Sequence, residues 1–233
     1  MANLTGARRA RYVQGMFARI ARRYDLMNRL MTVGQDRRWR REVIRRAALP
    51  AGGRLLDIGA GTGDLAREAL RQYPDCHPVA ADFTLEMMQV GKDRVTLSGL
   101  GWSAADALCL PFLSGVFDAV VSGFLLRNVS DVQVALREQY RMLRPSGRIV
   151  FLDTTRPSRN LLSPLINFHL HTVIPALGQV VTGSREAYTY LPETTDAFLE
   201  AKKLAALMIQ AGFQEVGFRR LMLGTIAIHW GRK

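Results

Sequence analysis

The sequence is poor in cysteine and contains no long apolar run. Its two cysteines, Cys76 and Cys109, do not stand in a spacing that binds metal. This excludes a disulfide framework and a cysteine-rich zinc site, so we expect no metal and a reducing compartment. The longest run without Asp, Glu, Lys or Arg covers residues 160–184, and prolines and polar residues interrupt it too often for a membrane-spanning helix. A secretory signal requires an apolar stretch after its basic start, and no such stretch follows the early arginines.

Lysine is scarce as well, because only four lysines accompany 28 arginines in a chain of net charge +12. Residues 1–50 alone contain thirteen arginines against three acidic residues, a net charge of +10. Such a local excess predicts an anionic partner, either a phosphate backbone or a membrane surface. A solvated arginine-rich surface without a partner is the alternative.

The basic N-terminal region has the periodicity of an amphipathic helix. Between Tyr12 and Met31, apolar residues recur every three or four positions, and arginines separate them. This region is expected to lie on anionic lipid or to pack on the rest of the protein. A further helix is predicted over 35–48, and it ends at the turn formed by residues 49–53.

Downstream, short apolar strands alternate with helices, which predicts a parallel sheet with right-handed crossovers. Two strand-like runs joined at Gly224 then predict a C-terminal antiparallel hairpin. The fold class is therefore α/β and Rossmann-like, with a mostly parallel seven-stranded sheet. The predicted strands are 54–58, 77–82, 100–105, 117–122, 148–153, 215–223 and 225–230, and the predicted helices are 65–72, 84–97, 132–143 and 195–210.

A glycine-rich loop follows the first strand and precedes a helix. Glycines allow a ligand to approach the backbone closely, and the helix N-terminus offers free N–H groups. Asp82 ends the next strand, where a carboxylate can bind ribose hydroxyls. Asp64 occupies the position at which a dinucleotide site has a third small residue, and a carboxylate there suits a cationic ligand better than a pyrophosphate. S-adenosylmethionine (SAM), with its sulfonium and ammonium groups, fits this pattern.

Several longer motifs resemble those of class I SAM-dependent methyltransferases, and more narrowly those of the UbiE/COQ5 family. The family motifs are FARIARRYDLMNRLMTVGQDRRWRR (17–41), LLRNVSD (125–131) and YTYLP (188–192), beside the general motifs LLDIGAGTGDLA (55–66), AADF (80–83), ADALCLPF (105–112) and FDAVVS (117–122). The resemblance implies C-methylation of the ring of a reduced polyprenyl quinone precursor. Demethylmenaquinol is the preferred substrate, and a benzoquinol of ubiquinone biosynthesis, or both, is the alternative.

The resemblance also implies the domain organisation and the residues of the site. We expect a basic helical lid at 1–50 and a methyltransferase domain at 51–233, with an apolar insertion at about 158–192 that admits the substrate. Tyr24, Arg127 and Asn128 are the candidate catalytic residues. Arg127 would stabilise a phenolate and Asn128 would orient a ring oxygen, unless Arg127 is structural and pairs with Asp131. The implied cofactor-binding residues are Gly59, Gly61, Thr62, Gly63, Asp82, Phe83, Asp106, Ala107 and Gly123.

The chain departs from the family pattern at three places, and these concern the substrate more than the cofactor. Gly123 replaces a common serine, Leu125 replaces a common glycine, and residues 153–157 read DTTRP where EFSKP is typical. Asp106 has a structural alternative as the cap of a turn.

The uncharged segment at 160–184 is expected to line the path of a polyprenyl tail or to form a homodimer interface. With the arginine-rich N-terminus, it predicts a cytoplasmic protein held at the inner face of an anionic membrane. An RNA methyltransferase is disfavoured, because the basic region has few aromatic residues for base stacking and the loop after the fourth strand lacks the amino-methylation motif. A non-catalytic member of a quinone-biosynthesis complex is the remaining alternative.

Overall fold

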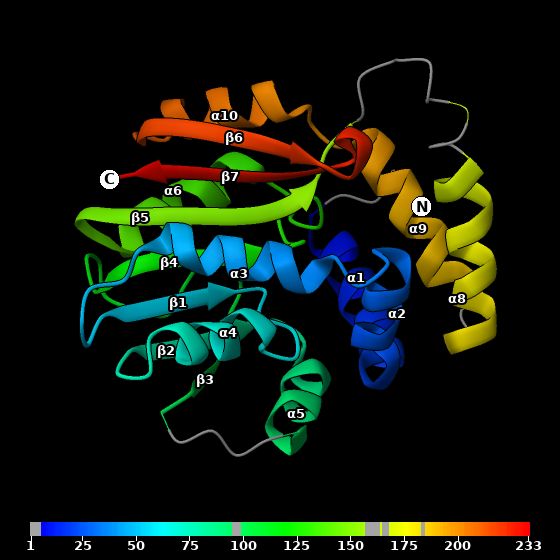
Figure 1. The fold of residues 1–233 in the computed structure, drawn as a ribbon, viewed down its shortest axis with the longest axis horizontal. Coiled ribbons are helices and arrows are strands. Elements are labelled where there is room, and N and C mark those ends of the chain that lie inside the picture. Colours follow the sequence, from blue (N-terminus) through cyan, green and yellow to red (C-terminus); the bar gives the residue numbers. More distant parts are fainter. Residues whose placement is uncertain (1–5, 95–98, 157–163, 165–167, 183–184) are drawn as a thin grey trace.

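A single mixed sheet forms the centre of the molecule (Figure 1). The computed structural model describes residues 6–94, 99–156, 164, 168–182 and 185–233. Seven strands of these residues have the order β3-β2-β1-β4-β5-β7-β6, and only β7 pairs antiparallel with both of its neighbours. The predicted fold class is therefore confirmed. The strands are β1 (Arg54–Ile58), β2 (His77–Asp82), β3 (Gly101–Ala104), β4 (Phe117–Gly123), β5 (Leu143–Thr154), β6 (Gln214–Leu221) and β7 (Ile226–Arg232).

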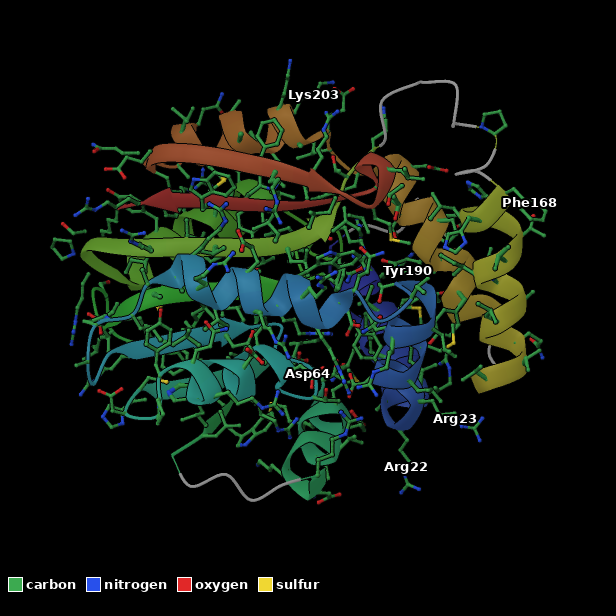
Figure 2. All side chains as sticks on the ribbon, in the orientation of Figure 1. Arg22, Arg23, Asp64, Phe168, Tyr190 and Lys203 are labelled. Carbon is green, nitrogen blue, oxygen red and sulfur yellow. The ribbon has the colours of Figure 1, made fainter. Side chains whose placement is uncertain are left out.

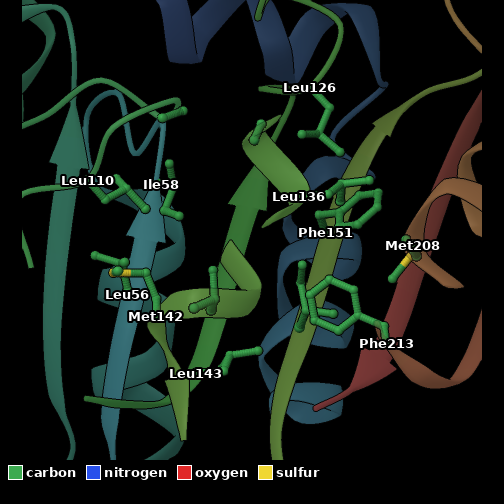
Figure 3. Close-up of a cluster of buried hydrophobic side chains, with 14 of the residues drawn as sticks. Leu56, Ile58, Leu110, Leu126, Leu136, Met142, Leu143, Phe151, Met208 and Phe213 are labelled. Atoms are coloured by element: carbon green, nitrogen blue, oxygen red, sulfur yellow. The ribbon is translucent and has the colours of Figure 1, made fainter. Parts of the chain in front are cut away.

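Helices cover both faces of the sheet because its central strands are apolar on both sides. Along β5, Ile149 and Phe151 face one hydrophobic cluster, whereas Val150 and Leu152 face the other. The helices α6 (Val132–Met142) and α10 (Ala201–Gln210) cover the first face, whose cluster is drawn in Figure 3. The second face is covered by α3 (Asp36–Ala47) and α4 (Asp64–Gln72).

A third hydrophobic cluster lies outside the sheet, and we call the helices that form it the roof. It joins two segments far apart in the sequence, which lie side by side at one end of the sheet (Figure 1). These segments are α1 (Gly6–Ile20), a 3₁₀ turn (Ala21–Arg23) and α2 (Tyr24–Met31), and a π-helical turn (His169–Val173), α8 (Ile174–Thr182) and α9 (Arg185–Ala197). The buried residues of the cluster are Met16, Ile20, Met27, Met31, Leu170, Ile174, Tyr188 and Tyr190.

Part of the predicted lid packs on the sheet. Helix α3 lies within residues 1–50, yet Trp39, Val43 and Ile44 pack on the sheet rather than on the roof. The predicted apolar insertion contributes Leu170 and Ile174 to the interior of the roof, because α1 and α2 cover them. Residues 158–163 and 165–167 of that insertion lie outside the described residues.

Several element boundaries also differ from the predictions. The predicted helix 195–210 is two helices, because the chain leaves α9 at Ala197 and Glu200 adopts an extended conformation before α10 begins. Strand β5 begins at Leu143 rather than at Arg148, because Leu143 already pairs with Phe117 of β4; the strand continues through the predicted turn, where Ser146 has a positive φ of 66°. Helix α5 (Leu85–Arg94) begins one residue later than predicted, and residues 95–97 of its predicted range lie outside the described residues. No described helix is long and apolar enough to cross a bilayer.

Candidate active site

A cavity of about 340 Å³ opens between the carboxyl ends of the strands and the roof. The order of the sheet changes direction between β1 and β4, and ligands of open α/β sheets bind at such a point. The loops after β1, β2 and β4 line one side of the cavity, while α1 and α2 line the other. All predicted cofactor-binding residues except Gly63 are among the described residues of its wall.

The glycine loop keeps its backbone open to the cavity. Gly59 and Gly61 have positive φ values of 62° and 57°, which residues with a side chain adopt only with strain. A Cβ at Gly59 would lie 2.7 Å from the Cδ1 atom of Leu125. Leu125, one of the departures from the family pattern, therefore packs directly over the loop. Gly63 instead faces Trp102, and a Cβ at Gly63 would lie 2.8 Å from an atom of the Trp102 ring.

Asp82 connects the loops that follow β1 and β2. Its carboxylate accepts hydrogen bonds from the Gly61 and Thr84 N–H groups, each at 2.7 Å. Burial raises the pKa of Asp82, although these backbone hydrogen bonds oppose the shift. Asp106 accepts from the Leu108 N–H at 2.9 Å while it lines the cavity, so the predicted alternative of a turn cap and a position in the site coexist.

Asp57 is a cavity residue that sequence reasoning missed. It is fully buried in β1, and burial raises its pKa to about 8. The Ala66 N–H donates to its Oδ2 atom at 3.1 Å, but no described residue hydrogen-bonds its buried Oδ1 atom. A carboxyl oxygen left in this state requires a partner from a ligand or from water. The signal in the sequence was a carboxylate inside an otherwise apolar strand.

Asp64 does not act as the free charge that the sequence suggested. Arg40 lies 3.5 Å from its Oδ2 atom, and Arg67 lies 3.7 Å from its Oδ1 atom. Arg67 is itself buried and donates to the Thr62 carbonyl oxygen at 2.8 Å. The negative charge of Asp64 is therefore largely compensated, and Asp57, Asp82 and Asp106 are the described carboxyl groups that line the cavity without an arginine bound to them.

A second missed residue, Asp25, joins the roof to the glycine loop. It belongs to α2 and lines the cavity. The Thr62 hydroxyl donates to its carboxylate at 2.9 Å, and Arg94 of α5 forms an ion pair with the same group. Thr62 was predicted as a cofactor ligand, and here its side chain holds the roof closed over the loop.

The substrate side of the cavity contains two of the three candidate catalytic residues, Tyr24 and Asn128. The Asn128 side-chain N–H donates to the Phe124 carbonyl oxygen at 3.0 Å, and the Tyr190 hydroxyl lies 3.5 Å from its Oδ1 atom. Tyr190 comes from the YTYLP motif on α9, so the roof also orients this amide. One N–H of the amide remains for a ligand.

Arg127 occupies a different environment from Asn128. It is buried and forms an ion pair of 2.9 Å with Asp153, which belongs to the DTTRP departure. The predicted alternative partner, Asp131, instead caps α6 by accepting from the Val134 N–H. Arg127 is absent from the described wall of the main cavity and lines a second cavity of about 440 Å³, which shares Val129 and Ser130 with the first.

The turn between β4 and Arg127 is strained. Phe124 has a positive φ of 61°, which is rare for a residue with a side chain. The Arg127 guanidinium lies 5.1 Å from the centre of the Phe124 ring, and the Phe124 N–H donates to Leu152 in β5 at 2.7 Å. These contacts hold the turn that presents Asn128 to the cavity.

The fold and this site together define a class I SAM-dependent methyltransferase. Gly59 and Gly61 bring the backbone of the loop into the cavity wall, and the unpartnered Asp57 Oδ1 atom suits the donor groups of SAM. The chain belongs to the ubiE/COQ5 methyltransferase family, which matches residues 4–233. The predicted family, enzyme class and cofactor are thus confirmed.

Named relatives support this assignment. A Desulfotalea psychrophila protein named ubiquinone/menaquinone biosynthesis C-methyltransferase UbiE is 46% identical over 95% of this chain and 90% of its own length. A Roseiflexus castenholzii protein named demethylmenaquinone methyltransferase is 42% identical over 97% of this chain and 94% of its own length. The solved structure of a SAM-dependent methyltransferase from Thermotoga maritima has a TM-score of 0.66 at 19% identity and shows the same fold over 94% of this chain and 98% of that chain.

We expect the affinity for SAM to rise severalfold between pH 6.5 and 8, because the raised pKa of Asp57, about 8, keeps this group neutral at lower pH. The cationic ligand favours the ionised carboxylate, so binding releases a proton and becomes easier as pH rises. The free energy of unfolding changes in the opposite direction: it should fall as pH increases towards 8, because the folded protein must then ionise a buried carboxyl group. Titration calorimetry in buffers of different ionisation enthalpy measures the released proton. Asp57→Asn should remove the dependence of SAM affinity on pH. An affinity that does not change with pH in the unaltered protein would contradict the role of Asp57 in SAM binding.

Proposed function

We propose that the protein C-methylates the ring of a reduced polyprenyl quinone precursor, with demethylmenaquinol as the preferred substrate. The observation that carries the proposal is that the glycine loop and Asn128 line the same cavity under the roof. The names of both relatives, demethylmenaquinone methyltransferase and UbiE, support this substrate class.

The cofactor half of the cavity holds SAM, which supplies an electrophilic methyl group on its sulfonium. Asp82 is placed to accept hydrogen bonds from ribose hydroxyls, since it lines the cavity at the end of β2 and a carboxylate oxygen can accept a second hydrogen bond beside a backbone N–H. Asp57 offers a buried carboxyl oxygen to a ligand donor. Phe83, Asp106 and Ala107 form the wall on the side where the adenine would lie.

The substrate half must make a ring carbon nucleophilic and hold it in line with the methyl group. An unperturbed phenol titrates near pH 10, so hydrogen bonds to its oxygen assist ionisation. The free N–H of the Asn128 amide provides such a donor, and its position is fixed by Phe124 and Tyr190. Tyr24 lines the same region from α2 and can hydrogen-bond the second ring oxygen. Placing the two reactants together supplies a large part of the rate enhancement.

Arg127 acts in this proposal as a positioning residue rather than as a direct contact of the phenolate. Its guanidinium is bound to Asp153 and lies against Phe124, one layer behind the cavity wall. It therefore holds the strained turn that carries Asn128. Apolar residues of the roof and turn, Val13, Phe17 and Leu125, cover the ring.

A single-turnover assay tests the reaction. Methyl-labelled SAM is mixed with the protein and with chemically reduced short-chain demethylmenaquinol, the matching benzoquinol, or bulk RNA. We expect label in the naphthoquinol. Label in both quinols would show dual activity, and label in neither, with SAM binding intact, would overturn the proposal.

The variant Asn128→Leu gives a finer test of the site. It is similar in size but lacks the amide, so we expect the rate of methyl transfer to fall about tenfold or more, the cost of one hydrogen bond to a developing negative charge. Cofactor affinity should stay unchanged, because Asn128 lies on the substrate half. An unchanged transfer rate would remove Asn128 from the mechanism.

A further inference from the structure

The outer face of α2 exposes an apolar stripe to solvent. Leu26, Leu30 and Val33 are 50%, 43% and 79% exposed. Their spacing of four and three residues places them on one side of the helix and its C-terminal turn. Met27 and Met31 of the same helix are buried in the roof, so the exposed stripe is a second apolar face that the interior does not use.

Arginines frame this stripe, and no acidic residue interrupts it. Arg22 and Arg23 directly precede α2 and point away from the sheet (Figure 2), and Arg29 is exposed between Leu26 and Leu30. No described carboxylate pairs with Arg22 or Arg29, while Arg23 donates to the Val181 carbonyl oxygen at 2.7 Å. The only acidic residue of α2, Asp25, is turned inward to Thr62.

Exposed aliphatic side chains framed by arginines fit some binding partners better than others. A second copy of the chain, related by twofold symmetry, would bring the same arginines together, and like charges in contact are unfavourable. A nucleic acid would satisfy the arginines but would leave three aliphatic side chains against phosphate and water. A bilayer with anionic headgroups provides both a negative surface and an apolar layer beneath it.

We propose that this face, formed by Leu26, Leu30 and Val33 with Arg22 and Arg29, docks on an anionic lipid bilayer. The inference deepens the proposed function, on which its biological purpose rests. Helix α2 presents Tyr24 and Asp25 to the cavity from its opposite side. A helix with its side chains is about 10–12 Å across, so docking places the cavity within about that distance of the lipid. The tail of a polyprenyl substrate then stays in the bilayer while its ring enters the site.

Co-sedimentation of the full chain with vesicles tests the proposal. Vesicles of phosphatidylcholine alone are compared with vesicles that contain one quarter phosphatidylglycerol. We expect binding to the anionic vesicles only. Arg22→Gln/Arg29→Gln should weaken it about 20-fold, since each arginine near an anionic surface contributes roughly fivefold. Leu26→Gln/Leu30→Gln should weaken it severalfold, and this loss should persist at high salt, which screens only the charges.

The matched control is Lys202→Gln/Lys203→Gln, which removes the same charge from α10, far from Arg22 and Arg23 (Figure 2). It should reduce binding by less than twofold. An equal loss in this control, or no binding of the unaltered protein, would overturn the proposal. A dimer in solution that the leucine variant dissociates would assign the face to a second copy instead.

Different outcomes would refute the proposed reaction and the proposed docking face. Methylation of a quinol without a tail should be equal in all four proteins, because none of these substitutions lies in the cavity. Vesicle binding without methylation would refute the proposed reaction and leave the docking face intact.

Discussion

Replacing Arg127 with methionine should lower the free energy of unfolding by about 3–5 kcal/mol, because it leaves a buried charge without its partner. Arg127 and Asp153 are both buried, and their ion pair links the turn after β4 to β5. Burial already raises the pKa of Asp153 even though Arg127 opposes the shift. Without Arg127, Asp153 will take up a proton on folding, so the loss of stability should grow as pH rises.

The same variant should reduce methyl transfer more than it reduces cofactor affinity. Arg127 supports Phe124 and so the position of Asn128, whereas the glycine loop does not touch it. Chemical denaturation and calorimetric titration with S-adenosylhomocysteine measure the two effects separately. The double variant Arg127→Met/Asp153→Leu is the control, because apolar replacement of a buried ion pair is often close to neutral. Full stability and full turnover in Arg127→Met would show that the ion pair has no role.

Asp25→Ala should weaken SAM binding about 10–150-fold, the equivalent of roughly 1.5–3 kcal/mol for hydrogen bonds to a charged group. The Asp25 carboxylate is the point at which α2, the Thr62 hydroxyl and Arg94 meet. Its removal leaves the partly buried Arg94 guanidinium without this partner and releases the roof from the loop that binds the cofactor. We therefore expect faster dissociation of the cofactor.

Substitutions of Thr62 provide the controls for Asp25. Thr62→Ser keeps the hydroxyl and should bind SAM nearly as well as the unaltered protein, whereas Thr62→Val should approach Asp25→Ala. Stopped-flow measurement of cofactor release distinguishes a loosened roof from a lost contact. Equal release rates in Asp25→Ala and the unaltered protein would refute the role of Asp25 in holding the roof against the glycine loop.

Local patterns predicted the parts of the molecule that depend on local sequence. Strand β2 was predicted at His77–Asp82, where it lies, because a short apolar run stands between turn residues and a terminal carboxylate. The division between α9 and α10 was missed because Pro192 suggests a helix boundary, yet the chain accommodates it inside α9. In that region the packing of the roof outweighs local propensity.

In the candidate site too, local features could be predicted and long-range contacts could not. The glycine loop and Asp82 were predicted from a strand, a turn and a spacing of about twenty residues. The contact between Asp25 and Thr62 joins positions 37 residues apart, and that between Arg127 and Asp153 joins positions 26 apart. The first depends on how α2 packs over the glycine loop, and the second depends on the pairing of β4 with β5. The raised pKa of Asp57 depends on burial, and sequence alone shows only that a carboxyl group is present.

The roof also has a consequence for the order in which the chain folds during its synthesis. Arg23 and Val181, which are hydrogen-bonded, are separated by 158 positions. At about 5–20 residues per second, a ribosome needs roughly 8–30 s to make the intervening chain. Helices α1 and α2 are therefore the first to leave the ribosome and among the last to be covered. Until α8 and α9 arrive, Met16, Met27 and Met31 lack the neighbours that bury them, and the newly made N-terminus depends on other surfaces for protection.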